Sequence, residues 1–126
     1  MAKREKYTLE FEMRCSPSIL FEFLSTTSGL GEWFAERVTQ RDNVFEFHWN
    51  GSIETAEMIA AELNEYVVYR WDWMDKDEYF EFRIESSPVT NVTLLTVTDF
   101  ADKKEKDDQI RLWESQIHDL KYRIGS

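Results

Sequence analysis

The sequence predicts an α+β protein in which a curved antiparallel sheet wraps around one long C-terminal helix, with two short helices after the first strand. Three observations support this fold class. Most of the chain consists of short segments that alternate apolar and polar residues, the pattern of half-buried strands. Helix-start signals follow the first such segment, and only residues 107–124 carry a long helical stripe. A single sheet curving around that helix would bury the stripe and the apolar strand faces together.

The first strand and the two short helices are predicted near the N-terminus. Apolar residues alternate with polar ones over residues 7–15, which indicates a strand. Ser16 and Pro17 follow, and a serine N-cap with proline in the first helical position starts a helix. The apolar spacing at residues 19–24 fits a helix of about two turns. Similar spacing at residues 30–34 indicates a second short helix, although two glycines in this stretch disfavour it.

Five further strands are expected before the long helix. They are predicted at residues 45–49, 53–61, 67–73, 80–85 and 92–100. Asn50-Gly51 between the first two is a strong hairpin signal. Pro88 and Asn91 mark the turn before the last strand. Sequential strands joined by short turns form an antiparallel sheet, so we expect that arrangement here.

The long helix is the clearest single element. Its apolar residues recur at spacings of three and four: Ile110, Trp113, Ile117, Leu120 and Ile124. Asp107 and Asp108 suit the N-terminal turn of a helix, and Gly125 suits its end. The chain contains no internal repeat, low-complexity tract or linker. We therefore expect one domain over residues 1–126.

Composition narrows the class of protein. A chain of 126 residues that is 42% hydrophobic and 15% aromatic can build one core. Its net charge of −10 repels phosphate backbones, which argues against nucleic-acid and anionic-membrane binding. No apolar run approaches the roughly 20 residues of a membrane span, and the N-terminus lacks the apolar stretch of a signal peptide. The single cysteine, Cys15, cannot form an internal disulfide, so we expect a cytoplasmic protein.

Several local patterns add to the order of elements. They are residues 16–24 followed by Gly29-Leu30 and residues 32–35, VFEFHW at 44–49, YRWDW at 69–73, and TLLTVTDFA at 93–101 followed by Leu112-Trp113-Glu114. Together they resemble the START-like (SRPBCC) superfamily, and within it the branch related to the activator of the heat-shock chaperone ATPase. The chain is similar over about its whole length to short acidic START-like proteins of Bacteroidetes-type bacteria. These are packing motifs, which are specific for fold and weak for function.

The resemblance implies a helix-grip fold with a cavity between the long helix and the concave face of the sheet. Relatives hold lipids, sterols, polyketides or other apolar molecules there, and a few perform catalysis. Others, including the chaperone activator, bind a protein through the outer surface. Because fold alone does not choose between these functions, the residues of the expected cavity have to be considered directly.

A pocket for a small apolar molecule is lined mainly by apolar and aromatic groups. The candidates are Phe45, Phe47, Trp49, Tyr69, Trp71, Trp73, Phe80, Phe82, Trp113, Ile117 and Leu120. The same rings could instead fill the core completely, because native interiors leave few voids. The leading hypothesis is non-catalytic binding of a small apolar or amphipathic ligand. The alternative is a protein-binding accessory, similar to the chaperone-activator branch, whose acidic outer surface meets a basic partner.

Catalytic and metal-binding patterns are absent from the sequence. His48 and His118 lie off the apolar faces and are expected at the surface, and neither H-x-H nor H-E-x-x-H spacing occurs. Asp72 and Asp99 lie near aromatic strand ends and Glu57 could point inward, but most carboxylates alternate with apolar residues and belong to the solvent face. We therefore expect no catalytic residue, metal or cofactor, which leaves an enzyme of the cyclase or hydrolase kind unsupported. The oligomeric state is open.

Overall fold

The computed structural model describes residues 4–87, 89–90 and 92–125. Within them the elements follow one another as β1 (Glu5–Met13), α1 (Pro17–Ser25), α2 (Thr27–Trp33), β2 (Arg37–Arg41), β3 (Val44–Trp49), β4 (Ser52–Glu62), β5 (Tyr66–Trp71), β6 (Phe80–Ser86), β7 (Thr93–Ala101) and α3 (Lys106–Ile124). The strands of this part of the chain form one antiparallel sheet in the order β1-β7-β6-β5-β4-β3-β2. The predicted fold class, a curved antiparallel sheet around a C-terminal helix, is confirmed.

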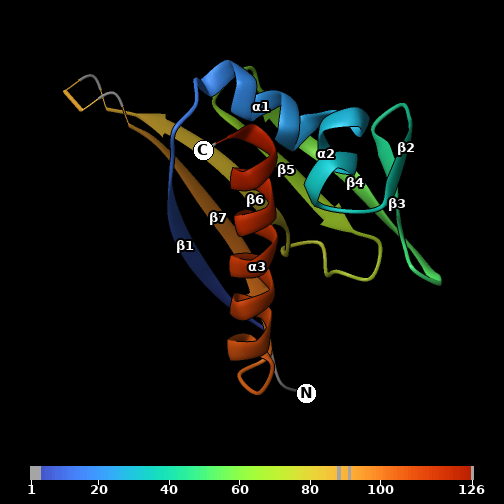
Figure 1. Ribbon diagram of the computed structural model, residues 1–126. Coiled ribbons are helices and arrows are strands. Elements are labelled where there is room, and N and C mark those ends of the chain that lie inside the picture. The colour runs from blue at the N-terminus through green and yellow to red at the C-terminus, as the bar shows by residue number, and fades with distance from the viewer. Residues whose placement is uncertain (1–3, 88, 91, 126) are drawn as a thin grey trace.

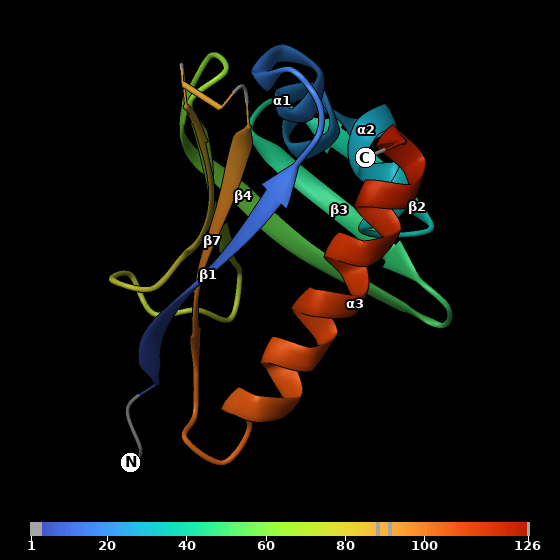
Figure 2. The same ribbon diagram turned by 60° about the vertical axis from the view of Figure 1, so that its left-hand side comes forward.

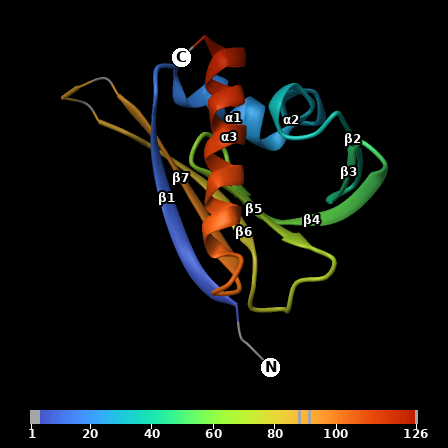
Figure 3. The same ribbon diagram turned by 60° about the horizontal axis from the view of Figure 1, so that its bottom comes forward.

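The sheet is curved, and the helices lie in its hollow. Figure 1 shows α3 running across the concave side, with α1 and α2 above it. Figure 2 shows the strong twist of the sheet, with α3 passing obliquely in front of it. Figure 3 shows the sheet bending from β1 round to β2 and β3, so that the three helices occupy the open side. None of the helices in the described ranges has the length and apolar character needed to cross a membrane.

The two short helices meet at Thr26, which belongs to the ends of both. Ser16 caps α1 as predicted, because its Oγ accepts a hydrogen bond from the Ile19 amide at 3.3 Å. Thr26 Oγ1 donates to the Glu22 carbonyl at 2.8 Å and accepts from the Gly29 amide at 3.0 Å. One hydroxyl thus bonds a carbonyl in the last turn of α1 and an amide in the first turn of α2. With this cap α2 begins at Thr27, three residues before the predicted start at residue 30.

The described residues contain one strand more than the sequence predicts. β2 pairs with β3 at the edge of the sheet, opposite Val44–His48. Its sequence, RVTQR, is almost entirely polar, so alternation alone does not reveal it. Backbone pairing to β3 forms this strand. A second difference concerns Trp73, expected at the end of a strand: β5 ends at Trp71, and Trp73 lies in the following loop. The predicted turn at Pro88 and Asn91 lies outside the described residues.

The core lies between the concave face of the sheet and the three helices. The fully buried aromatic rings come from three strands, β3, β5 and β6: Phe45, Phe47, Tyr69, Phe80 and Phe82. From α3, the predicted stripe residues Trp113, Ile117 and Leu120 are buried against them, while Ile110 and Ile124 are half-buried. The Tyr69 hydroxyl donates to the Leu24 carbonyl at 2.7 Å, which ties the sheet to α1.

Candidate functional site: a tryptophan-lined cavity

A cavity of about 390 Å³ lies at one end of the core. It is bounded on one side by the N-terminal half of α3 and on the other by the ends of β3, β4 and β5. In Figure 1 the lower half of α3, the loop after β5 and the tip of the β3–β4 hairpin surround this region. Its walls are formed by Phe34, Trp49, Ser52, Glu54, Trp71, Trp73, Asp99, Gln109, Leu112, Trp113 and Gln116. Trp73 and Leu112, which are 50% and 58% exposed, lie at its mouth. The volume is in the range of small-molecule sites.

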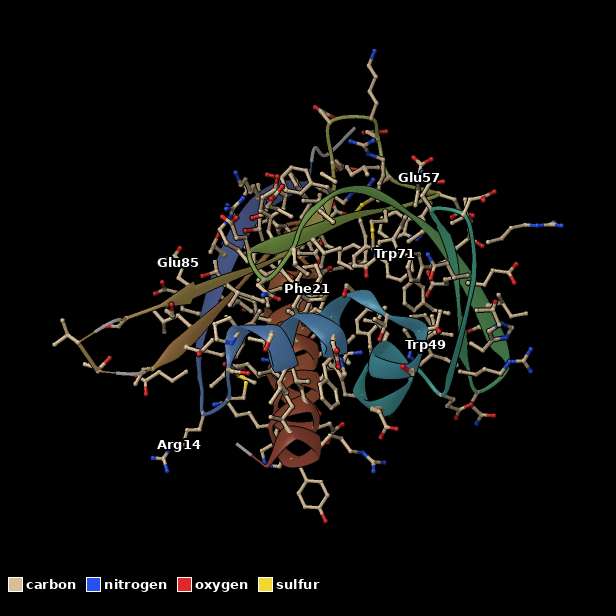
Figure 4. The ribbon with its side chains drawn as sticks, turned by 90° about the horizontal axis from the view of Figure 1, so that it is seen from above. Arg14, Phe21, Trp49, Glu57, Trp71 and Glu85 are labelled. Atoms are coloured by element: carbon tan, nitrogen blue, oxygen red, sulfur yellow. The ribbon has the colours of Figure 1, made fainter. Side chains whose placement is uncertain are left out.

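Aromatic rings form most of the wall. Phe34 stands between two of the tryptophans, with ring centres 6.3 Å from Trp71 and 5.8 Å from Trp113 and nearly parallel planes. The ring centres of Trp49 and Trp71 are 6.1 Å apart. Figure 4 shows Trp49 and Trp71 on the inner side of the curved sheet. These rings touch one another, so the wall is held in place by packing before any molecule enters.

Three of the four indole N–H groups are used within the protein. Trp49 Nε1 donates to the Phe34 carbonyl at 2.9 Å, and Trp113 Nε1 donates to Asp99 Oδ2 at 2.9 Å. Trp73 Nε1 donates to Glu54 Oε1 at 3.3 Å. Because these donors already have acceptors, the surface that these indoles offer to the cavity is mainly their carbon rings.

Asp99 is the most buried carboxylate of the site, with 5% of its surface exposed. Its Oδ1 accepts from the Phe100 amide at 2.7 Å, and its Oδ2 accepts from Gln109 Nε2 at 2.8 Å and from Trp113 Nε1 at 2.9 Å. Burial raises the pKa of Asp99 to about 6, although the three hydrogen bonds oppose this shift by favouring the ionised form. Asp99 is thus a carboxylate that changes charge close to neutral pH.

Gln109 organises this end of α3. Its side-chain amide nitrogen also lies within hydrogen-bond distance of the Tyr7 hydroxyl, at 2.6 Å, and of the Phe100 carbonyl, at 3.0 Å, so its two hydrogens are shared among three acceptors. Tyr7 is the cross-strand partner of Asp99, so β1, β7 and α3 meet here. Burial and the nearby Asp99 carboxylate raise the pKa of Tyr7, which keeps its hydroxyl protonated. The sequence offered no signal for Gln109, because a glutamine on a helix is usually a surface residue.

Asp99 was not assigned to the interior from the sequence, although the alternation of apolar residues in β7 indicates that position. Asp99 follows Leu95 and Val97 at a period of two, and all three are buried on the same face of β7. Alternation therefore placed this carboxylate inside, against the expectation that such residues face solvent. In β4 the inward carboxylate is Glu54, which pairs with the buried Phe47. The idea that Glu57 could point inward is wrong: it is exposed, pairs with the exposed Val44, and lies outside the sheet in Figure 4.

The loop after β5 carries Trp73 to the mouth and is anchored by Glu78, which is 5% exposed. Glu78 accepts hydrogen bonds from Arg4 Nε at 2.9 Å and Nη2 at 2.6 Å, and from the Asp75 amide at 2.9 Å. The Arg4 guanidinium lies over the Trp73 ring, 5.0 Å from its centre. The loop is therefore tied to the start of β1 and holds Trp73 beside the cavity.

The eleven residues expected to line a pocket divide into two groups. Trp49, Trp71, Trp73 and Trp113 line the cavity. The others are almost completely buried in the core beside it: Phe45, Phe47, Tyr69, Phe80, Phe82, Ile117 and Leu120. The sequence left open whether these residues line a pocket or fill the core. In the structure seven of them are buried in the core, and the four tryptophans line a cavity at its end. Contact of any of these residues with a ligand stays a prediction.

The two histidines lie away from the cavity wall. His118 is exposed on α3, as expected. His48 pairs with Arg37 and Ile53 and is half-buried, with its Nε2 atom lacking a hydrogen-bond partner among the described residues. Within the same residues, no group of three His, Cys, Asp or Glu side chains is arranged to hold a metal ion.

Asp99 should titrate with a midpoint near pH 6 rather than near its ordinary value of 3.8, which carboxyl ¹³C NMR can measure. Because the folded-state pKa is above the unfolded one, the folded protein holds an extra proton between these values. The contribution of Asp99 to the free energy of unfolding should therefore fall as pH rises from about 4 to 6, by about 2–3 kcal/mol in total.

The variant Asp99→Asn isolates this effect, because it removes the titrating group. As pH rises from about 4 to 6, the free energy of unfolding of the wild type should fall relative to that of the variant. Above about pH 6 the difference between the two proteins should be constant. A carboxyl midpoint below pH 4.5 for Asp99 would contradict the raised pKa that burial predicts.

A curved sheet gripping one long helix, with a cavity between them, defines the helix-grip class of ligand- and protein-binding domains. The chain belongs to the START-like superfamily, whose domain matches residues 1–126. The family resemblance seen in the sequence is thereby confirmed. START-like domains commonly bind ligands or act as accessories to other proteins. No curated protein matches the sequence.

Solved structures show the same fold. A Bacteroides fragilis protein solved by solution NMR is 30% identical, with a TM-score of 0.69, over 98% of this chain and 93% of that one. The Aha1 dimer from Colwellia psychrerythraea is 16% identical, with a TM-score of 0.79, over 93% of each chain. Protein MLL2253 from Mesorhizobium loti is 15% identical, with a TM-score of 0.79, over 96% of this chain and 97% of that one. The last two likenesses concern the fold alone.

Proposed function

We propose that this protein binds a small apolar or amphipathic molecule, without catalysis, in the cavity beside the N-terminal half of α3. The observation that carries the proposal is the cavity of about 390 Å³ walled by four tryptophans and Phe34. A mainly apolar wall with a few oriented polar groups is typical of ligand sites.

The mouth of the cavity supports the same function. Trp73 and Leu112 expose about half of their surface there, although both are large apolar side chains. A ligand seated between them would remove this surface from water, which is favourable at roughly 25 cal/mol per Å². The buried polar groups nearby are already hydrogen-bonded, so an apolar ligand would not strand them.

The neutral fluorescent probe N-phenyl-1-naphthylamine should bind at micromolar concentration, with a rise in its fluorescence. Trp73→Ala removes one wall at the mouth and should weaken binding by about fivefold, the scale of one aromatic contact. The matched control is Tyr122→Ala, which removes an aromatic ring that is 80% exposed on α3 and does not line the cavity. Equal weakening by both variants, or no binding to the wild type, would contradict the proposal.

The second candidate function is a protein-binding accessory that acts through the outer face of the sheet. One observation favours it: exposed glutamates occupy outward positions on four strands, at Glu10, Glu12, Glu46, Glu57 and Glu85. Figure 4 shows Glu57 and Glu85 on this side. With a net charge of −10, such a face suits a basic partner, and the association would weaken as salt is added. Such binding would be insensitive to Trp73→Ala, which separates it from the cavity function.

A further inference from the structure

We propose that the cavity selects organic cations, in particular ammonium groups with apolar substituents, over neutral or anionic molecules of the same shape. This inference rests on the proposed function and adds the chemical class of the ligand. Two independent features of the wall carry it: the sign of its charged groups and the nature of its rings.

Among the described residues, the charged groups that line the cavity are acidic, namely Glu54 and Asp99, and no lysine, arginine or histidine lines it. Arg4 lies at its edge, over the ring of Trp73. The two carboxylates come from opposite sides, Glu54 from β4 on the far part of the sheet and Asp99 from β7 beneath α3. An anionic ligand would meet repulsion from both, and the nearby Arg4 guanidinium is already paired with Glu78. A cation would gain from both carboxylates in a partly water-excluded space, where charge interactions are stronger than in bulk water.

The rings of the wall add a second attraction for cations. A cation near the face of an aromatic ring is attracted by the negative charge of the π-system, and tryptophan is the strongest of the aromatic side chains in this respect. Trp49, Trp71, Trp73 and Trp113 all line the same space. Three of their N–H groups are bonded within the protein, so the part of each indole that is open to the cavity is mainly carbon ring. Arg4 already occupies a position over the Trp73 ring, and Trp71 and Trp113 each stack on Phe34. A cation would therefore contact the ring surface that these groups leave open.

The protein already contains one example of the recognition inferred here. The Arg4 guanidinium lies over the ring of Trp73 and pairs with the carboxylate of Glu78. A tryptophan face together with a buried carboxylate thus holds a cation at the edge of the cavity. Glu54 likewise places a carboxylate beside the cavity tryptophans, since its Oε1 accepts a hydrogen bond from Trp73 Nε1 at 3.3 Å.

The test compares two probes of equal shape and different charge. Benzyltrimethylammonium carries a quaternary nitrogen, and neopentylbenzene has an uncharged carbon in its place. Each competes with N-phenyl-1-naphthylamine at pH 8 and low salt. The cation should bind at least about tenfold more tightly than its neutral counterpart, because cation–π contacts and both carboxylates act on it alone. Phenylacetate, which carries a negative charge, should compete more weakly than either.

A matched pair of variants locates the effect. Glu54→Gln removes the inward charge of β4 while keeping the shape of the side chain. It should weaken the binding of benzyltrimethylammonium by about fivefold and leave the binding of neopentylbenzene unchanged. Glu57→Gln removes the same charge from the outer face of the same strand and should change neither. If the cation and its neutral counterpart bind equally, or if both variants have the same effect, the charge preference is overturned while ligand binding stands. If the naphthylamine probe does not bind the wild type, the proposed function fails as well.

Discussion

Replacing Trp113 with alanine should lower the free energy of unfolding by about 3–5 kcal/mol, the usual cost of removing a large aromatic side chain from a core. Trp113 is only 5% exposed and contacts the rings of Phe34, Phe82 and Phe80 at centre distances of 5.8, 5.6 and 6.3 Å. Its truncation would enlarge the existing cavity and remove a hydrogen bond to the buried Asp99. Urea denaturation followed by circular dichroism measures the loss.

The control for this change is the preceding residue of the same helix. Leu112 is 58% exposed, so Leu112→Ala should change the free energy of unfolding by no more than about 0.5 kcal/mol. Trp113→Phe should fall between the two, since it keeps a ring in the stack and loses only part of the volume and the bond to Asp99. A cost below about 1 kcal/mol for Trp113→Ala would show that α3 does not pack on the sheet as described.

Gly29→Ala should destabilise the protein by about 3 kcal/mol, at the upper end of the usual cost of overpacking. At this position α2 passes so close to α1 that an added Cβ would overlap the Glu22 carbonyl oxygen and lie 2.6 Å from Phe23 Cα. These are backbone atoms of α1, so they cannot rotate away as a side chain would. The two helices would have to separate, and the Thr26 hydrogen bonds that join them would be lost.

Gly31→Ala is the matched control, because the same substitution two residues later meets nothing within 4 Å. Alanine favours helix over glycine by up to about 1 kcal/mol, so this variant should be neutral or more stable than the wild type. Thermal unfolding of both variants distinguishes the effects. Similar melting temperatures for the two variants would contradict the close crossing of α1 and α2.

The two glycines show how far sequence reasoning reached in the short helices. Both counted against a helix at this position, because glycine lowers helix propensity. In the structure Gly29 allows the backbone of α2 to approach α1, a contact between two elements that no local pattern reports. The same limit applies to β2, whose polar sequence forms a strand only because β3 offers its backbone groups for pairing.

The candidate site was partly predictable. Alternation and helical spacing indicated four of its tryptophans, since Trp49, Trp71, Trp73 and Trp113 all belong to apolar patterns. The same rule applied strictly to β7 would have placed Asp99 inside with Leu95 and Val97. Phe34, Glu54 and Gln109 could not be assigned to the site, because their roles depend on which strand end and which helix turn lie opposite them.

The sequence by itself determined the order of the elements apart from β2, the antiparallel sheet, the buried stripe of α3 and the helix-grip family. These follow from periods of 2 and 3.6 residues and from capping residues, which are local properties of the chain. The tertiary structure decided which rings fill the core and which surround open space. Phe47 and Trp49 share one face of β3, yet Phe47 is fully buried and Trp49 lines the cavity. The physical reason is the curvature of the sheet: it sets the distance to α3 at each strand position, and that distance decides whether a side chain meets another side chain or a cavity.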